Sequence, residues 1–373
     1  MRILQLISSS GFFGAEKVML QLSGLLSDSG YEVYSGVLSN KAGSHMDFVR
    51  AAEKKGMRVK VFDCRGKFDV RAIKKLRTFI KKEQIDLVHS HGYKSNFYVL
   101  AAACGLNIKK VTTCHNWISC SSKMKVYEYI DKFLLRNFDQ VAAVSENVRN
   151  EIYAAGVSVD KVDLIKNGID IDTYAFCSQK PDLKKSFGIS AGDLVVGSVG
   201  RLSEEKGHEY LIKAFSQVVI DHPDYKLLIV GDGVLRESLE LLVRSLEIQD
   251  KVIFTGIRDD IPELLNIMDI FVLPSLTEGM PLALLEAMAA GKVVIASKVG
   301  EIPDIIDDQF NGGLVSPKDI DALSRAIAKL IKSGETRKTF GDRACEKVNS
   351  NFSAQNMAQQ YMCLYGSVLN GVK

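Results

Sequence analysis

A stretch in the second half of the chain combines cationic side chains with glycine-rich turns, which suits a phosphate ligand. It runs over residues 197–207 and reads G-S-V-G-R-L-S-E-E-K-G. Arg201 offers a planar fork of donors, and Lys206 is expected in the first turn of a helix, where a bound anion would offset its unfavourable place in the helix dipole. We expect both cations to bind phosphate oxygens. The alternative is a solvated surface cluster neutralised by Glu204 and Glu205.

A second stretch, residues 274–291, reads P-S-L-T-E-G-M-P-L-A-L-L-E-A-M-A-A-G. It predicts the end of a strand, a loop with Glu278 and Gly279, and a helix with Pro281 at its first position. The free N–H groups of that helix favour an anion, which Gly279 would allow to approach the backbone closely. Glu286 lies in an otherwise apolar helix and needs donors, for example ribose hydroxyls. The alternatives are a lysine partner or solvent for Glu286, and a surface position for Glu278.

Histidines follow predicted strands in the first half of the chain. His115 comes directly after a strand expected at 109–114, at the edge of the sheet where ligands bind, although it could simply bond the backbone there. His89 and His91 alternate along another strand end. Two histidines without a third ligand are weak evidence for a metal site. We expect one to be packed and the other to line a cleft.

Short β-rich runs alternate with helix-length segments along the chain, which predicts an α/β fold with parallel sheets. The expected strands are 2–7, 31–38, 57–62, 85–89, 109–114, 139–144, 193–199, 225–230, 251–255, 269–273 and 292–296, with helices near 206–220, 233–247 and 281–290 in the second half. The alternation pauses after Lys166-Asn167-Gly168. We therefore expect doubly wound domains at 1–170 and 171–352, and a final helical segment, 353–373, that could cross back to the first domain.

The composition is that of a globular protein, with 46% apolar and 25% charged residues and a net charge of +3. The longest apolar run, residues 97–106, is half of the roughly 20 residues that a membrane-spanning helix needs. The N-terminus reads as a strand and not as a signal peptide. Seven scattered cysteines without a C-x-x-C pair indicate a reducing compartment. We expect a cytoplasmic protein.

The segment 65–82 is strongly basic. Its cations are Arg65, Lys67, Arg71, Lys74, Lys75, Arg77, Lys81 and Lys82, against the single acid Asp69. Apolar residues at helical spacing make a solvated crossover helix one interpretation. The other is docking to an anionic membrane surface or a lipid-linked diphosphate. A nucleic-acid partner is disfavoured, because no aromatic residues are interleaved with the basic ones.

Together these stretches resemble glycosyltransferase family 4, the large group of retaining enzymes with the GT-B fold. The resemblance rests on G-R-L-S-E-E-K-G, on the stretch 274–291 with its two glutamates eight residues apart, and on K-N-G-I-D at 166–170. Weaker echoes are G-F-F-G-A-E-K from residue 11, D-L-V-H-S-H from 86 and the N-G-G-L-V-S-P turn near 311. The echoes span nearly the whole chain. They imply two Rossmann-like domains that face a central cleft.

The resemblance also implies roles for residues. Arg201 and Lys206 would bind the donor diphosphate, Glu278 would contact the transferred sugar, Glu286 would hold the ribose and His115 would lie near the reacting sugar. The expected catalytic residues are Glu278 and His115; the expected donor-binding residues are Arg201, Lys206, Glu286, Gly279, Met280, Pro281, Leu282 and Gly14; the acceptor candidates are His91, Tyr93, Asn116 and Trp117. One departure from the family is Glu301, which would narrow or charge the edge of the donor site.

The resemblance implies transfer of a sugar, with retention of configuration, from a nucleotide-sugar to a glycan or lipid-linked acceptor in surface polysaccharide or lipopolysaccharide assembly. UDP is favoured over GDP as the carrier. No cofactor or metal is expected, because fixed cations can stabilise the departing diphosphate and the Asp-x-Asp patterns at 170–172 and 319–321 read as structural. A nucleotide-sugar epimerase of the same fold and a non-catalytic nucleotide-sugar-binding scaffold are the alternatives.

Overall fold

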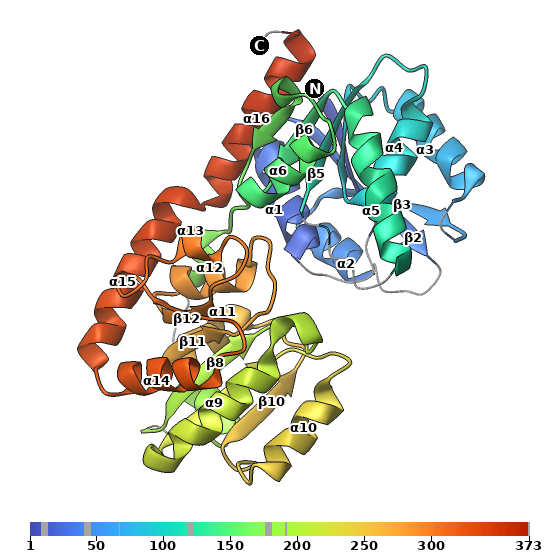
Figure 1. Ribbon diagram of the computed structural model, residues 1–373. Coiled ribbons are helices and arrows are strands. Elements are labelled where there is room, and N and C mark those ends of the chain that lie inside the picture. The colour runs from blue at the N-terminus through green and yellow to red at the C-terminus, as the bar shows by residue number, and fades with distance from the viewer. Residues whose placement is uncertain are drawn as a thin grey trace. The chain divides into compact units, whose positions relative to one another are not determined.

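A computed structural model describes residues 1–8, 14–40, 46–66, 68–115, 117, 122–175, 181–190 and 192–371. The chain forms two compact units, shown in Figure 1. The first unit comprises Met1–Gly168 together with Ala354–Lys373, and the second is Ile169–Ser353. The first unit is therefore built from both ends of the chain.

The first unit contains a seven-stranded parallel sheet in the order β3-β2-β1-β4-β5-β6-β7. Its strands are β1 (Arg2–Ile7), β2 (Glu32–Asn40), β3 (Arg58–Cys64), β4 (Leu87–His91), β5 (Lys109–Cys114), β6 (Gln140–Ala143) and β7 (Val162–Leu164). Its helices are α1 (Gly14–Asp28), α2 (Met46–Lys54), α3 (Val70–Lys82), α4 (Tyr93–Ala103), α5 (Ser122–Leu134), α6 (Glu146–Ala154) and α16 (Ala354–Asn370), with short 3-10 turns η1 (Leu135–Asn137) and η2 (Val159–Lys161). The chain turns back at β1 and β4, which are neighbours, so the switch point of this sheet lies between them.

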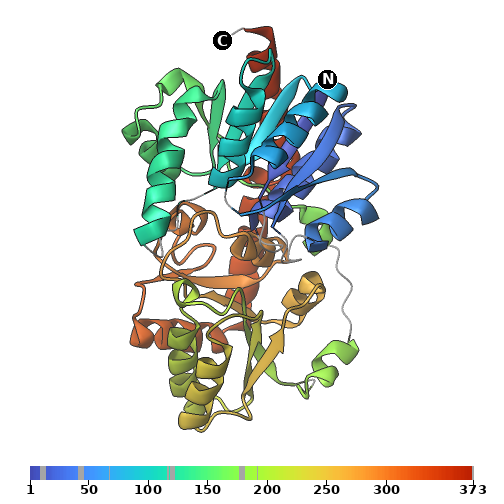
Figure 2. The ribbon, with the colours of Figure 1, turned by 90° about the vertical axis from the view of Figure 1, so that its right-hand side faces the viewer.

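Alternate residues of each strand face opposite sides of this sheet. Leu4 and Leu6 pack with α3, α4 and α6 on one face, whereas Ile7 packs with α1 and α2 on the other. Helix α16 packs against α1, and Figures 1 and 2 both show it beside the first unit. The last helix therefore completes the face that carries α1.

The second unit contains a six-stranded parallel sheet in the order β10-β9-β8-β11-β12-β13. Its strands are β8 (Leu194–Val199), β9 (Tyr225–Val230), β10 (Val252–Gly256), β11 (Ile270–Leu273), β12 (Val293–Ser297) and β13 (Gly313–Val315). Its helices are α7 (Ile171–Ala175), α8 (Pro181–Ser186), α9 (His208–Asp221), α10 (Arg236–Ser245), α11 (Ile261–Ile267), α12 (Leu282–Ala289), α13 (Ile302–Ile305), α14 (Ile320–Ile331) and α15 (Gly334–Asn351), with the 3-10 turn η3 (Glu204–Lys206). The switch point here lies between β8 and β11.

Both sheets are doubly wound and parallel, so the predicted fold class is confirmed for each unit. The structure adds two strands, β7 and β13, to the eleven that were predicted. Strand β13 lies within the N-G-G-L-V-S-P stretch that was expected to be a turn. Both added strands have three residues and sit at an edge of their sheet, so neither shows an alternating pattern long enough to detect.

None of the helices within the described ranges has the length and apolar character that crossing a bilayer requires.

Candidate active site

The charged residues of the second unit gather at its switch point. Arg201 and Lys206 follow β8, and Glu278 follows β11, the strand next to it in the sheet. Parallel strands bring their carboxyl ends to one edge, so the two loops meet there. A backbone hydrogen bond of 2.8 Å from Leu276 N to Glu205 O joins them.

Two glycines let these loops approach each other closely. Gly207 has φ +65°, and a Cβ at this position would lie 2.2 Å from the carbonyl oxygen of Pro274. Gly300 has φ +54°, and its Cβ would lie 2.0 Å from the carbonyl oxygen of Glu278. Both backbone conformations disfavour any residue with a side chain. The loops after β8, β11 and β12 are therefore packed together at the level of the backbone.

Lys206 and Glu278 form an ion pair at this edge. Lys206 Nζ lies 2.6 Å from Oε1 of Glu278, and Ser275 Oγ donates to the same oxygen at 2.6 Å. The Glu278 side chain is only 8% exposed, so the charge is held in a largely desolvated position. The sequence predicted separate ligand groups for the two residues. In the structure they are each other's partners, whereas Glu205, one of the two acids of the alternative interpretation, pairs with Arg201.

Two details of the predicted helices are wrong. Lys206 does not lie in the first turn of a helix: it ends the 3-10 turn η3, and the left-handed Gly207 separates it from α9. Pro281 is not the first residue of α12 but the residue directly before it. Each prediction was off by one or two residues, the usual error for a helix boundary.

Arg201 lies on the outer side of the same loop. Its guanidinium is 3.6 Å from Glu205 Oε1, and half of its side chain is exposed. Glu205 also accepts a hydrogen bond of 2.6 Å from Ser203 Oγ. An exposed pair of this kind holds its geometry weakly, so Arg201 can reorient towards an anion at small cost.

Glu286 is buried in α12, at 2% exposure, as the apolar sequence around it predicted. The hydroxyl of Tyr174, on α7, hydrogen-bonds to it. Burial, followed by the charge of Glu286, raises the pKa of Tyr174, so the phenol stays protonated and donates. The solvent-exposed position considered from the sequence is not observed. The predicted donor residues Gly279, Met280 and Pro281 lie between Glu278 and this helix, and Leu282 is its first residue.

Glu301, expected to narrow or charge the edge of the donor site, is buried at 2% exposure directly before α13. The Asp-x-Asp residues lie elsewhere. Asp319 caps α14 by accepting a hydrogen bond from Ala322 N, and Asp170 accepts one from Thr173 Oγ1. Over the described part of the chain, no three His, Cys, Asp or Glu side chains are grouped as ligands of a metal ion would be.

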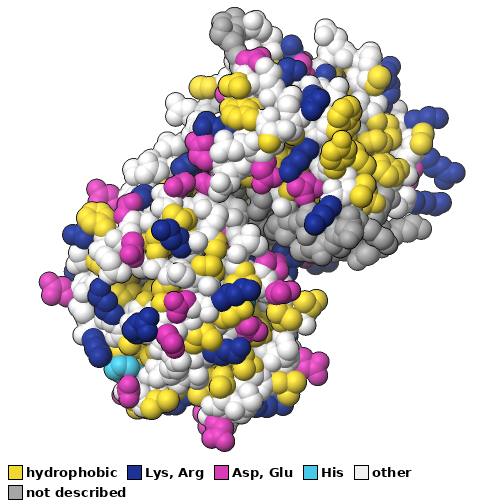
Figure 3. Space-filling view, viewed as in Figure 1, with side chains coloured by type: hydrophobic (Ala, Val, Ile, Leu, Met, Phe, Trp, Pro, Cys, Tyr) yellow, Lys and Arg dark blue, Asp and Glu magenta, His cyan; other side chains and the backbone are white. Residues whose placement is uncertain are grey.

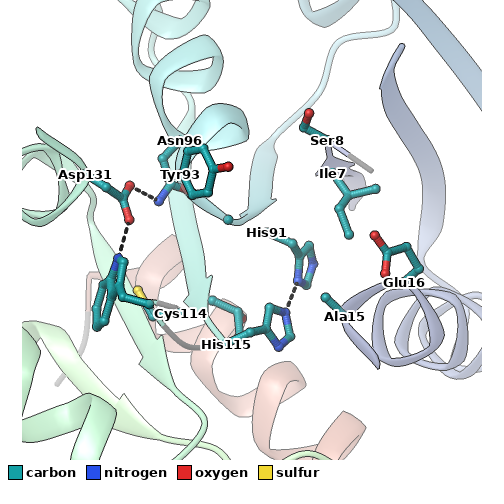
Figure 4. Close-up of a pocket in the computed structure, with 13 residues that line it drawn as sticks. Ile7, Ser8, Ala15, Glu16, His91, Tyr93, Asn96, Cys114, His115 and Asp131 are labelled. Atoms are coloured by element: carbon teal, nitrogen blue, oxygen red, sulfur yellow. Dashed lines mark hydrogen bonds between the residues drawn. The ribbon is translucent and has the colours of Figure 1, made fainter. Parts of the chain in front are cut away.

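The first unit has a pocket of its own at its switch point, with a volume of about 160 Å³ (Figure 4). It is lined by Ile7, Ser8, Ala15, Glu16, His91, Gly92, Tyr93, Asn96, Thr113, Cys114, His115, Trp117 and Asp131. The catalytic candidate His115 and the acceptor candidates His91, Tyr93 and Trp117 thus come together. The donor candidate Gly14 is the first residue of α1, next to Ala15 in the lining. Asn116 lies outside the described residues.

Hydrogen bonds tie two sides of this pocket. His91 Nδ1 and His115 Nε2 are 3.1 Å apart, as Figure 4 shows. On the other side Asp131 accepts from Asn96 Nδ2 at 2.7 Å and from Trp117 Nε1 at 3.0 Å. The indole ring is therefore held in one orientation beside the pocket.

The imidazoles of the pocket are neutral at ordinary pH. Burial lowers the pKa of His115 to about 4, and burial with the neighbouring histidines lowers the pKa of His91 well below its usual value. His89, expected to be the packed histidine, is fully buried behind the pocket, and burial lowers its pKa to about 3. Neutral imidazoles act as hydrogen-bond donors and acceptors rather than as cations.

Three polar residues of these sites were not singled out from the sequence. Glu16 was present in the G-F-F-G-A-E-K echo and could have been considered as a site acid. Asp131, in the middle of α5, and Tyr174, in the short α7, carry no local signal. They reach their sites only through the packing of whole elements.

Comparison with known proteins identifies the family. The model of glycosyl transferases group 1 matches residues 179–347, and that of glycosyltransferase family 4 matches residues 13–173. The chain is 30% identical over 310 residues to N-acetyl-alpha-D-glucosaminyl L-malate synthase of Bacillus anthracis, covering 82% of this chain and 81% of that one. The chain belongs to the group 1 glycosyltransferases.

Two further relatives of this glycosyltransferase are informative. It is 32% identical over 273 residues to the UDP-Gal:alpha-D-GlcNAc-diphosphoundecaprenol alpha-1,3-galactosyltransferase of Escherichia coli, and the matched residues cover 70% of each chain. The crystal structure of Anabaena HepE with UDP-glucose matches with a TM-score of 0.87 at 24% identity, over 98% of this chain and all of that one. The architecture is therefore GT-B, built from two Rossmann-like units.

Proposed function

We propose that this glycosyltransferase transfers a sugar, with retention and without a metal ion, from a UDP-sugar to a glycan or lipid-linked acceptor. The observation that carries the proposal is the grouping of Arg201, Lys206 and Glu278 at the switch point between β8 and β11. Nucleotides bind at this place in doubly wound sheets. The UDP complexes of HepE, and the UDP-Gal in the name of the Escherichia coli relative, favour UDP as the carrier.

The chemistry needs stabilisation of the departing diphosphate. Negative charge grows on the phosphates as the glycosidic bond breaks, while positive charge grows on the sugar ring. Lys206, Arg201 and the N–H groups at the start of α12 would stabilise the first, and the carboxylate of Glu278 would stabilise the second. Lys206 and Glu278 are held at this edge before the reaction, whereas Arg201 would turn towards the diphosphate as it binds. Glu286 would accept hydrogen bonds from the ribose.

In the first unit, the pocket at the ends of β1, β4 and β5 would hold sugar hydroxyls. His115 supplies a neutral imidazole, Glu16 and Asp131 supply carboxylates and Trp117 supplies an aromatic face. Such a mixture of polar groups and an aromatic ring fits a carbohydrate. We assign this pocket to the reacting sugars, and the acceptor to the loops around it.

A panel of UDP-, GDP- and ADP-sugars with EDTA present tests the donor site by thermal shift and by release of nucleoside diphosphate. One donor should raise the melting temperature, and Arg201→Ala and Glu286→Ala should abolish the shift. Arg244→Ala, an exposed arginine on α10, is the matched control and should keep it. If no donor binds, or binding requires a divalent cation, the assignment fails. Interconversion of UDP-sugars without any acceptor would instead identify the epimerase alternative.

A lipid-linked acceptor implies work at a membrane surface, in keeping with the diphosphoundecaprenol in the name of the Escherichia coli relative. Helix α5 exposes a row of large apolar side chains at helical spacing: Val126, Tyr129, Ile130 and Phe133. Figure 3 shows hydrophobic side chains gathered over this part of the first unit, with Lys and Arg at the neighbouring edge. Exposed apolar rows of this kind mark interaction surfaces.

The basic segment lies on the same unit. Arg71, Lys74, Lys75, Lys81 and Lys82 of α3 are exposed, and α4 packs between α3 and α5. Arg77 is not available to lipid, because its guanidinium binds backbone carbonyls at the end of α4. Lys67 lies outside the described residues. We propose that this surface docks on anionic lipid, to which each cation contributes about 1 kcal/mol.

Sedimentation with vesicles of neutral lipid, with and without an anionic lipid, tests this docking. Tyr129→Ser/Phe133→Ser should reduce vesicle binding several-fold, as should Lys74→Glu/Lys75→Glu. Ile220→Ser/Val234→Ser removes two equally exposed apolar side chains from the second unit and should change nothing. Binding that ignores lipid charge, or that the control reduces equally, would contradict the docking surface.

A further inference from the structure

A row of buried polar side chains crosses the middle of the first sheet. Gln5 pairs with His89 in the register of β1 and β4, and His91 pairs with Thr113 in that of β4 and β5. All four are at most 2% exposed and lie on the sheet face opposite to Leu4 and Leu6. Buried polar groups are costly unless they are hydrogen-bonded. This face therefore needs partners from the helices that cover it.

Helix α16 supplies these partners through two tyrosines. Tyr365 OH lies 2.6 Å from His89 Nδ1 and accepts a hydrogen bond from Gln5 Nε2 at 3.1 Å. Tyr361 OH lies 2.7 Å from Thr113 Oγ1, which is 2.7 Å from His89 Nε2. Both tyrosines are at most 1% exposed. The end of the chain thus completes a network that begins with its fifth residue.

The network continues from Gln5 into the pocket. Gln5 Oε1 lies 2.8 Å from His91 Nε2, and His91 Nδ1 lies 3.1 Å from His115 Nε2. We call these four linked groups the relay: Tyr365, Gln5, His91 and His115. It connects a tyrosine on α16 with the histidine that lies at the end of β5.

The relay has a direction. An amide oxygen only accepts, so His91 must carry its proton on Nε2 in order to donate to Gln5. A neutral imidazole has one N–H, so Nδ1 of His91 accepts, and His115 must donate to it from Nε2. Nδ1 of His115 is then left without a proton. Within the residues described, this nitrogen has no hydrogen-bond partner, and His115 lines the pocket.

We propose that Tyr365 and Gln5 are positioning residues that hold His115 as the Nε2–H tautomer, so that its bare Nδ1 accepts a hydrogen bond from a sugar hydroxyl in the pocket. Tyr365 acts by accepting from the Gln5 amide nitrogen, which turns the amide oxygen towards His91. The step is a hydrogen bond and transfers no proton. The sugar as the ligand of Nδ1 rests on the proposed function, whereas the tautomer does not.

The surroundings keep the relay neutral. Burial lowers the pKa of His115 to about 4, and with its neighbours that of His91 well below its usual value. Among the described residues, the titratable groups that line the pocket with these two imidazoles are Cys114 on β5, Glu16 on α1, Tyr93 on α4 and Asp131 on α5. His89 on β4 packs beside His91, and Tyr361 and Tyr365 on α16 pack on His89.

Nitrogen NMR of protein labelled with 15N-histidine reads the tautomer directly. The chain has six histidines, so His115→Gln assigns the signal. We expect a protonated Nε2 and an unprotonated Nδ1 for His115 at pH 7. Gln5→Met and Tyr365→Phe should each give a mixture of tautomers. Tyr361→Phe removes a hydroxyl from the same helix outside the relay and should leave the signal unchanged.

A second experiment distinguishes a role of Gln5 in orienting His91 from a role in packing alone. Gln5→Glu retains an oxygen that accepts from His91, so it should keep the tautomer, but its carboxylate stabilises a protonated His91. With the donor found in the panel, kcat/KM of Gln5→Met should fall about tenfold at pH 8, and that of Gln5→Glu should stay within about threefold. In a plot of kcat/KM against pH, the acid limb of Gln5→Glu should lie at higher pH than that of the wild type.

The outcomes distinguish this inference from the proposed function. A proton on Nδ1 of His115 in the wild type, or an unchanged tautomer in folded Gln5→Met and Tyr365→Phe, overturns the relay whatever the donor is. The expected tautomers together with an empty donor panel would leave the relay standing and reject the transferase assignment. Melting curves show whether Gln5→Met and Tyr365→Phe are folded. If one of them does not fold, the tautomer of His115 in the other tests the relay.

Discussion

Lys206 and Glu278 neutralise each other. The carboxylate is largely desolvated and shares one oxygen between Lys206 and Ser275. A diphosphate that reaches Lys206 would compete with Glu278 for the ammonium, and Glu278 would become available to the sugar. On the proposed function, the pair would keep both charges neutralised until a donor replaces one of them.

We predict that Lys206→Ala lowers kcat/KM by about 10² or more, because it removes a cation that stabilises the leaving diphosphate. Steady-state kinetics with the donor from the panel measures this change. The single variant Lys206→Ala should also have a lower melting temperature than the double variant Lys206→Ala/Glu278→Gln. The single variant leaves a desolvated carboxylate without its cation, whereas the double variant removes that charge as well. A fall in kcat/KM below threefold would remove Lys206 from the site.

Tyr174→Phe should lower the free energy of unfolding by about 1 kcal/mol, because Glu286 loses a hydroxyl donor. A ribose could then supply what the phenol supplied. The donor should therefore raise the melting temperature of Tyr174→Phe by more than that of the wild type. Equal shifts in the two proteins would show that the ribose and the phenol do not share this carboxylate.

At the scale of elements, the site depends on loops that touch through their backbones. The loop after β12 approaches the loop after β11 at Gly300, and the loop after β8 approaches it at Gly207. Neither contact involves a side chain of the site. The positions of Lys206 and Glu278 are therefore set by residues that do no chemistry.

We predict that Gly300→Ala lowers kcat/KM at least tenfold, because its Cβ would displace the backbone of Glu278. Gly188→Ala is the matched control. Gly188 has a similar φ of +68°, but no atom lies within 4 Å of the position of a Cβ. Both variants carry the strain of a left-handed backbone, so only Gly300→Ala should lose activity beyond its loss of stability, measured by melting. Equal losses of activity would contradict a role for this contact.

Sequence patterns predicted the elements that carry a long alternation. Strands β1, β5 and β9 were predicted to the residue, whereas β7 and β13 were missed because three residues at a sheet edge show no period. The charged residues in motifs were found because type and spacing reveal their chemistry. The ion pair of Lys206 with Glu278 could not be predicted because it depends on which strands are neighbours, and the contact of Tyr174 with Glu286 could not be predicted because it depends on the packing of α7 against α12.

The relay shows the same limit more strongly. Gln5 and Tyr365 are ordinary core residues in their local sequences, and the link between them spans 360 residues. Only the register of β1 with β4 and the return of α16 bring them together. The sequence predicted a histidine near the sugar but contained no local signal for the groups that orient it.

At the scale of the whole molecule, the buried histidines are unevenly distributed between the two units. Burial lowers the pKa of His89 to about 3 and of His115 to about 4, and that of His91 also falls; all three belong to the first unit. In the second unit burial, with Lys206, lowers the pKa of His208 to about 4. These imidazoles are neutral in the fold but take up protons near pH 6.5 when the chain unfolds.

Stability should therefore be highest above about pH 6.5 and fall as the pH drops towards 4, by about 1.4 kcal/mol per pH unit for each buried histidine. The first unit, with three of them, should lose protection before the second. Hydrogen exchange read by mass spectrometry at pH 7 and pH 5, corrected for the intrinsic rates, measures this. An equal loss of protection in both units would contradict the assignment of the pH dependence to these side chains.

The return of α16 to the first unit has a consequence for the order in which the protein forms. During synthesis, residues 1–168 leave the ribosome long before Tyr361 and Tyr365, so the polar face of Gln5 and His89 lacks at that time the helix that supplies its hydrogen-bond partners. The second unit is continuous in sequence and has all of its strands once Ser353 has emerged. The half of the enzyme that is made first is thus the half that is finished last. A chain that stops within α16 would have a complete second unit but a histidine network without its tyrosine partners.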